Sequence, residues 1–126
     1  MKVDSSAAMT LPAVLRDVFD SRRVWNDEGE AVELGSNVSE DEATLLHAAV
    51  HELRPRTSLE IGLAQGVSTL AMLAALRRNG DGHHHVLDPF QTRYGNCGRA
   101  MVQRAGLSEW YTFHEKFAED VIPALP

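Results

Sequence analysis

The chain has 126 residues, the length of one domain of modest size, and its 44% apolar residues are enough to build a core. Its net charge of -6 argues against a nucleic acid or an anionic membrane surface as the main partner, because either favours a basic face. One cysteine excludes an internal disulfide, and no apolar run has the length of a signal peptide or a membrane span, so we expect a cytoplasmic protein.

The first third of the chain is predicted to hold two helices separated by a loop. Residues 1–10 are expected to be loose, and apolar side chains at helical spacing predict a helix over residues 11–19. The polar stretch 26–37 predicts a loop with a short extended piece at 31–34. Ser39 and Glu42 then form an S-x-x-E capping box, which predicts a helix from Glu40 to Leu53, before Pro55.

Strands and helices alternate over the rest of the chain. The predicted order is a strand at 57–63, a helix at 66–80, a strand at 83–88, a helix at 98–107, a strand at 109–115 and a last helix at 117–125, disturbed by Pro123. This alternation predicts an α/β fold with a parallel sheet and right-handed crossovers. Ligands of such sheets bind outside the carboxyl ends of the strands, where Gly62, Asp88 and Glu115 fall.

The stretch "SLEIGLAQGVST" (58–69) has the composition of a ligand-binding turn. Gly62 ends the strand and Gly66 opens the helix, and a residue without Cβ lets the backbone approach a ligand or adopt a positive φ. The helix N-terminus offers unpaired N–H groups, and Ser68 and Thr69 add hydroxyls. These features favour a carboxylate or a phosphate near the turn.

The second strand adds a carboxylate at the same edge of the sheet. Asp88 follows Gly62 by 26 positions and can accept hydrogen bonds from the vicinal hydroxyls of a ribose. Pro89 and Phe90 come next and offer flat apolar surface to a base. The turn and this carboxylate together predict a site for a nucleoside that bears an anionic group.

The glycine spacing decides between nucleoside ligands. A dinucleotide turn has the pattern G-x-G-x-x-G, whereas this turn is G-x-x-x-G, with Ala64 at its middle position. The Glu60 carboxylate would repel a pyrophosphate but suits a ligand with a positive group. S-adenosylmethionine carries an ammonium, a carboxylate, a ribose and an adenine, and it fits this pattern.

The segments "LEIGLAQGVSTL" and "HVLDPFQ" resemble the first two motifs of class I S-adenosylmethionine-dependent methyltransferases, most closely methyltransferase family 24, and the resemblance covers residues 39–126. It implies a Rossmann-like sheet, S-adenosyl-L-methionine as cofactor and methyl transfer to a small molecule, most often to an oxygen. The cofactor-binding residues that it implies are Glu60, Gly62, Leu63, Ala64, Gly66, Ser68, Asp88, Pro89 and Phe90. The stretch 115–120 would border the adenine, with Lys116 and Phe117 where many relatives carry small or acidic residues.

The same resemblance implies that the fold is incomplete. Relatives have seven strands and place many of their catalytic or metal-binding side chains after the fourth, whereas this sequence supplies three strands and ends at Pro126. We therefore expect an N-terminal helix and loop segment (1–38) and the cofactor-binding half of a methyltransferase domain (39–126), with little activity alone. No catalytic residue or metal ligand can be named, and the open edge of strand 57–63 invites self-association.

Other interpretations remain open at this stage. The chain could be a nicotinamide-dependent oxidoreductase or epimerase, which the missing G-x-G-x-x-G disfavours, or a non-catalytic interaction fragment. Asp88 could merely cap the turn that follows it, and Glu60 could be a structural carboxylate. His83 to His85 alternate between sheet faces, so they cannot all bind one metal ion, and we expect them to be solvated. Cys97 has no identifiable base to activate it.

Overall fold

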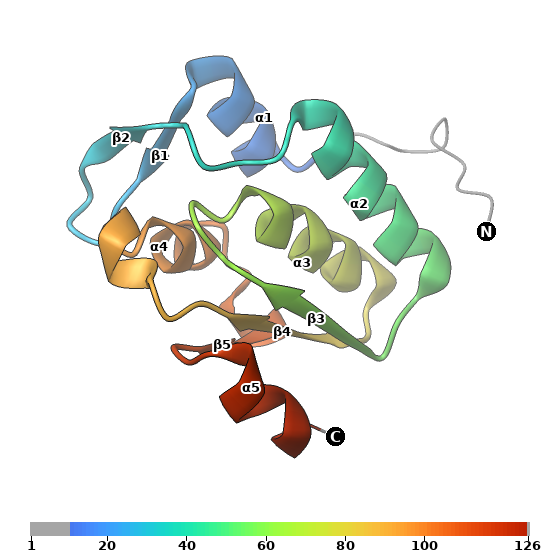
Figure 1. Cartoon of the computed structure of the whole chain (residues 1–126). Helices are drawn as coiled ribbons and strands as arrows, with labels where there is room; N and C mark the ends of the chain where they lie inside the picture. Colours follow the sequence, from blue (N-terminus) through green and yellow to red (C-terminus); the bar gives the residue numbers. More distant parts are fainter. Residues whose placement is uncertain (1–10, 126) are drawn as a thin grey trace.

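The computed structural model describes residues 11–125 as helices on a parallel sheet (Figure 1). The helices and strands are α1 (Ala13–Ser21), β1 (Arg23–Trp25), β2 (Ala31–Glu33), α2 (Glu40–Leu53), β3 (Thr57–Ile61), α3 (Val67–Asn79), β4 (His83–Leu87), α4 (Cys97–Arg104), β5 (Tyr111–His114) and α5 (Ala118–Val121). Short 3₁₀ turns follow β4, α4 and α5. The expected α/β alternation is therefore confirmed.

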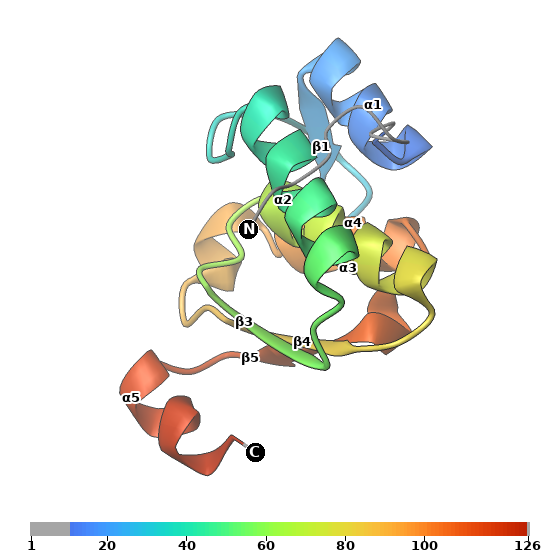
Figure 2. The same cartoon turned by 90° about the vertical axis from the view of Figure 1, so that its right-hand side faces the viewer.

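The main sheet has the strand order β3-β4-β5, and both pairings are parallel. Helices α2, α3 and α4 lie on one face, with α1 and the β1–β2 hairpin beyond them, while α5 lies on the opposite side (Figures 1 and 2). Within the described sheet, β3 pairs only with β4, and Leu59 and Ile61 are 40% and 67% exposed. The open edge that the sequence predicts is present.

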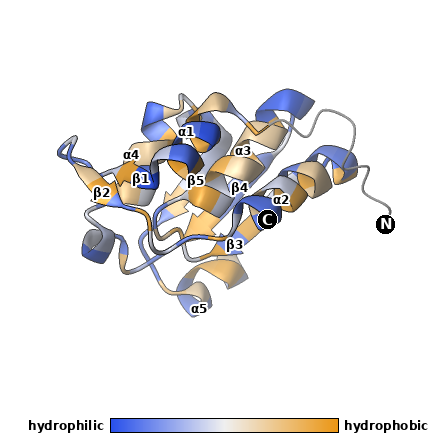
Figure 3. Cartoon of the chain, turned by 90° about the horizontal axis from the view of Figure 1, so that it is seen from above, coloured by the Kyte–Doolittle hydropathy of each residue, from blue (hydrophilic) through white to orange (hydrophobic). Residues whose placement is uncertain are grey.

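The core forms where α3 packs on the sheet. Figure 3 shows apolar residues along α3, and the side chains of Leu70, Leu73 and Leu76 are fully buried. Leu15 and Val18 of α1 belong to the same buried cluster. The N-terminal helix therefore packs into the core that supports the sheet.

Helix α2 has the predicted bounds because its end signals are local. Ser39 N–H donates to Glu42 Oε1 and Glu42 N–H donates to Ser39 Oγ, both at 3.1 Å, which completes the capping box. These hydrogen bonds lower the pKa of the Glu42 carboxyl. Arg54 closes the helix in the left-handed conformation, directly before Pro55.

The N-terminal hairpin is only partly predictable. The extended piece expected at residues 31–34 is β2, and it pairs antiparallel with β1, which the sequence analysis missed. Strand β1 is three residues long and is specified by its pairing, with Val24 opposite Val32. The prediction for residues 1–10 lies outside the described part of the chain.

The three histidines of β4 alternate between faces as expected, but their predicted solvation is wrong for one of them. His84 points toward the helices and is fully buried. His83 and His85 point to the other face and are half-buried, and His85 Nδ1 lies 3.0 Å from Nε2 of His114 on β5. Burial and the neighbouring histidines lower the pKa of His85.

None of the helices within residues 11–125 is long and apolar enough to cross a membrane.

A pH dependence of stability follows from His47, which lies on α2 and is 4% exposed. Within the described residues its Nδ1 has no hydrogen-bond partner, and burial, followed by the charges of Arg78 and His51, lowers its pKa from 6.5. Near its ordinary pKa, His47 therefore binds a proton less readily in the folded chain than in the unfolded chain. The contribution of His47 to the free energy of unfolding is fully present above the unfolded pKa and is lost as the pH drops below it.

Urea unfolding at pH 7.5, 6.5 and 5.5 measures this loss. Replacing His47 by Leu is expected to flatten the dependence, and His85→Gln should flatten it further, because the pKa of His85 is also lowered. An undiminished fall in the His47→Leu variant would contradict the assignment.

Candidate functional site

In the turn between β3 and α3, every second residue from Gly62 to Gly66 has a positive φ. Gly62, Ala64 and Gly66 have φ values of +93°, +48° and +90°. Two of these positions are glycine, which adopts such angles without a Cβ penalty, whereas Ala64 costs roughly 1–2 kcal/mol. The two glycines of the motif are therefore required by the backbone of the turn itself.

Asp88 connects this turn to the end of β4. Its Oδ2 accepts hydrogen bonds from the backbone N–H groups of Leu63 and Ala64, both at 3.1 Å, and from Gln91 Nε2 at 3.2 Å. Its Oδ1 accepts from the backbone N–H of Phe90 at 2.8 Å. Asp88 is 4% exposed. Its hydrogen bonds connect the turn after β3 to the loop after β4. Asp88 therefore does cap the turn that follows it, and one acceptor site on Oδ1 remains for a ligand.

Gln91 supports the same turn and was missed in the sequence. Its side chain is fully buried; Nε2 also donates to the carbonyl oxygen of Ala64 at 2.8 Å, and Oε1 accepts from the backbone N–H of Arg99 at 3.2 Å. Gln65, within the turn, connects it to the segment before α2, because its Oε1 accepts hydrogen bonds from the N–H groups of Gly35 and Ser36. A buried glutamine has no sequence signature, because its partners are backbone atoms of distant segments.

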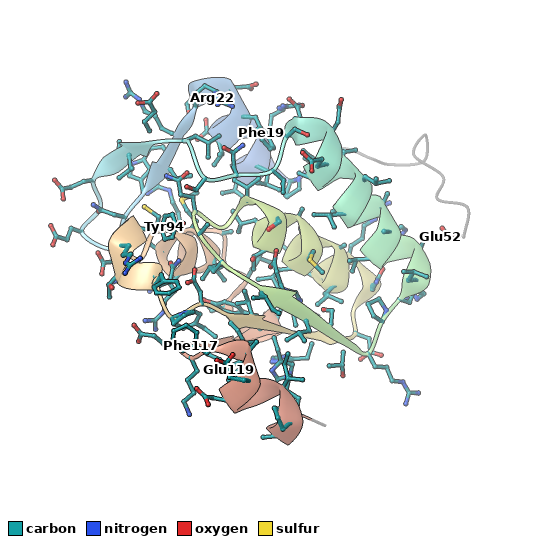
Figure 4. All side chains as sticks on the ribbon, viewed as in Figure 1. Phe19, Arg22, Glu52, Tyr94, Phe117 and Glu119 are labelled. Carbon is teal, nitrogen blue, oxygen red and sulfur yellow. The ribbon has the colours of Figure 1, made fainter. Side chains whose placement is uncertain are left out.

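A cavity of about 270 Å³ opens beside Asp88, between the carboxyl edge of the sheet and the start of α5. The residues that line it are Ile61, Gly62, Leu87, Asp88, Pro89, Phe90, Lys116, Phe117, Ala118 and Glu119. The rings of Phe90 and Phe117 meet edge to face, with centroids 5.8 Å apart, and both side chains are over 40% exposed. Figure 4 labels Phe117 and Glu119 where the chain enters α5.

Glu60 lies on the other face of β3 and does not line this cavity. Its carboxylate accepts hydrogen bonds from the hydroxyls of Ser68 and Thr69 in the first turn of α3. The buried His84 adds a contact of 3.1 Å from Nε2 to Glu60 Oε1. The side chain of Glu60 keeps 15% exposure.

The nine predicted residues thus fall into three groups. Those that line the cavity are Gly62, Asp88, Pro89 and Phe90. Those in the hydrogen-bonded cluster on the helix side are Glu60 and Ser68. Those that form the turn itself are Leu63, Ala64 and Gly66, of which only Ala64 is not buried. The stretch 115–120, which the sequence analysis expected to border the adenine, supplies Lys116, Phe117, Ala118 and Glu119 to the cavity wall, whereas Ile61 and Leu87 were missed.

Cys97 is not a reactive group of this site. Cys97 is fully buried, and burial, followed by the charge of Asp27, raises the pKa of its thiol, so it packs rather than reacts. Among residues 11–125, no three His, Cys, Asp or Glu side chains are grouped so that they could hold a metal ion.

Solved structures of methyltransferases share this fold. The O-methyltransferase TomG from Streptomyces achromogenes, in complex with SAM, superposes with a TM-score of 0.67 at 23% identity, over 96% of this chain and 50% of that one. The SAH-bound methyltransferase PaMTH1 from Podospora anserina gives 0.71 at 18% identity, over 91% and 46%. An O-methyltransferase from Bacillus cereus in complex with SAH gives 0.67 at 20%, over 94% and 50%. The chain spans about half the length of these structures.

A parallel sheet with a glycine turn at its carboxyl edge places the chain in the Rossmann-like α/β class. The model of a methyltransferase-domain family, methyltransferase family 24, matches residues 59–126, more than half of the sequence. The chain therefore belongs to this methyltransferase-domain family. A comparison with curated protein sequences finds no match.

The first prediction from this site concerns Asp88. Asp88→Asn replaces one acceptor oxygen by a donor and removes the charge, so buried N–H groups lose their partner. We expect a loss of about 1–3 kcal/mol in the free energy of unfolding, measured by urea denaturation. Asp81→Asn, at an exposed carboxylate before β4, serves as the control and should stay within about 0.5 kcal/mol.

A second prediction concerns Gly98 of α4, which packs against the turn. A Cβ there would lie 2.4 Å from Leu63 Cγ and 2.7 Å from the carbonyl oxygen of Ala64. Gly98→Ala should cost about 1–3 kcal/mol of stability by overpacking, although alanine favours a helix. Gly35→Ala, where nothing lies within 4 Å of the added atom, is the matched control. Equal melting temperatures for both variants would refute the close approach.

Proposed function

We propose that this chain holds the cofactor-binding part of an S-adenosyl-L-methionine-dependent methyltransferase that methylates an oxygen of a small molecule. The observation that carries the proposal is the family match over residues 59–126, which spans Glu60, the glycine turn, Asp88 and the cavity beside it. The similar structures of TomG and of the Bacillus cereus O-methyltransferase are complexes with SAM and SAH, which supports this cofactor. The same match favours this function over a nicotinamide-dependent oxidoreductase or a non-catalytic fragment.

The residues present suit this cofactor. A nucleoside would occupy the cavity, where Phe90 and Phe117 offer ring surface to the adenine and Asp88 Oδ1 keeps an acceptor site for a ribose hydroxyl. No heavy atom lies within 4 Å of a Cβ built on Gly62, so the backbone is open to a ligand there. Glu60 would face the ammonium of the methionine part, with Ser68 beside it.

S-adenosylmethionine supplies, when bound, a methyl group on a positively charged sulfur. The part of the chain described here contributes binding and orientation, which accelerate a transfer by holding the two reactants in line. The turn residues Leu63, Ala64 and Gly66 form the backbone against which the cofactor would lie. Pro89 and Phe90 would border its adenine base. We assign no general base and no catalytic residue.

The remaining assignments are also proposals. We propose a small-molecule acceptor and a cytoplasmic location, the latter supported by the single cysteine. We also propose that neither a nucleic acid nor a membrane is a partner, which the net charge of -6 supports. We further propose residues 39–126 as the cofactor-binding half of the methyltransferase domain, preceded by the segment 1–38. Self-association through the open edge of β3 is supported by its exposed Leu59 and Ile61.

Calorimetry with S-adenosylhomocysteine tests the cofactor assignment. We expect the chain to bind it and to bind NAD at least tenfold more weakly. Phe117→Ala should weaken binding roughly tenfold, because a base loses a stacking surface worth about 1–3 kcal/mol. Ile122→Ala, at an exposed apolar residue that does not line the cavity, is the matched control. No measurable binding of S-adenosylhomocysteine, or equal binding of NAD, would contradict the proposal.

A further inference from the structure

A buried polar network extends beneath the candidate site from β4 to α3. Ser58 Oγ lies 2.7 Å from His84 Nδ1, and His84 Nε2 lies 3.1 Å from Glu60 Oε1. Ser58 and Glu60 are two residues apart on β3 and point to the same face, and His84 is the residue paired with Ser58 in the sheet. The histidine ring therefore spans from one β3 side chain to the other.

The direction of one hydrogen bond in this network follows from its chemistry. An ionised carboxylate only accepts, so Nε2 of His84 donates to Glu60 in either charge state of the ring. Ser58 can donate to Nδ1 when the ring is neutral, because a hydroxyl is both donor and acceptor. Since the side chain of His84 is completely buried, it can influence a ligand only through Glu60.

The carboxylate of Glu60 has room for one more partner. Its Oε1 accepts from Thr69 and His84, and its Oε2 accepts from Ser68. A carboxylate offers about four acceptor sites, so one site on Oε2 is left, and the 15% exposure of the side chain provides access to it. His84 and Thr69 thus hold Oε1, while Oε2 has Ser68 as its one partner.

We propose that His84 is a positioning residue of the cofactor site, which fixes Glu60 so that its free acceptor site meets a ligand ammonium. This inference rests on the proposed function. It assigns to β4 a role in recognising the amino-acid end of the cofactor, although His84 does not touch it. Ser58 contributes to this positioning because its hydroxyl hydrogen-bonds to Nδ1, the other ring nitrogen of His84.

Two ligands separate this role from a structural one. S-adenosylhomocysteine carries the ammonium, and 5′-methylthioadenosine has the same nucleoside without the amino-acid end. We expect His84→Leu to weaken binding of S-adenosylhomocysteine about tenfold and to leave binding of 5′-methylthioadenosine within twofold, measured by calorimetry on the full chain. His84→Gln should restore most of the loss, because its side-chain amide can donate to Glu60 from a similar position.

His85→Leu is the matched control, since this neighbour points to the opposite face of β4 and contacts His114 instead. It should leave the ratio of the two affinities unchanged. If wild-type chain binds neither ligand, the proposed function fails and this inference with it. If wild-type chain binds and His84→Leu lowers both affinities equally or neither, only the role of His84 is overturned.

A measurement on the wild-type chain covers the case in which His84→Leu does not fold. The ring Nε2–H signal of His84 in a ¹⁵N-correlated NMR spectrum should shift on addition of S-adenosylhomocysteine, because the ligand ammonium withdraws charge from Glu60. 5′-Methylthioadenosine should leave it in place. A signal that responds identically to both ligands would overturn the proposal.

Discussion

The candidate site depends on the hydrogen bonds of one buried carboxylate. The turn after β3 uses three left-handed residues, so its backbone follows no regular ladder, and its N–H groups need partners from elsewhere. Gly62 donates to the Leu87 carbonyl at 2.7 Å, and Asp88 accepts from the next two N–H groups. Asp88 therefore shapes the surface on which a ligand would lie before it contacts any ligand. The role in ribose binding that we propose for Asp88 comes in addition to this structural role.

The two acidic side chains of the site have different surroundings. Glu60 points toward α3, whereas Asp88 borders the cavity that faces α5. A ligand that contacts both has to extend from β3 to the end of β4, and the backbone N–H of Gly62 joins these two segments by donating to the Leu87 carbonyl. Gly62 is exposed, has a φ of +93° and would have nothing near an added Cβ. The positive φ therefore favours glycine, and the open space beside it leaves room for a ligand to approach the backbone.

The sequence predicted elements whose signals are local, and missed contacts that depend on packing. Helix α2 was predicted to the residue because a capping box begins it and Pro55 follows it. Strand β1 was missed because three residues carry no pattern without their partner strand. The alternation of faces along β4 was predictable, but the burial of His84 depends on where α3 packs. The sequence placed Asp88 at the end of the second predicted strand, and β4 does end directly before it. Its backbone partners follow from a turn geometry that no single residue type specifies.

Strand β4 supports both parts of the site. It is the middle strand of the sheet, and Val86 and Leu87 are almost completely buried, so its backbone is held on both sides. From it, His84 reaches Glu60, and Asp88 directly after it holds the turn. Geometry built on such a strand is more precise than geometry built on a loop.

The cavity wall formed by α5 is less firmly held than the part of the site built on β4. Helix α5 has four residues, and its neighbour Phe117 is 49% exposed. Few contacts therefore fix this wall, and its rings can adjust to a bound base at small cost. By this argument the amino-acid end of the proposed cofactor meets a rigid surface set by β4, whereas its base meets a surface that adapts. Selectivity for the ammonium should accordingly depend on the sheet, and tolerance toward the base on the segment after β5.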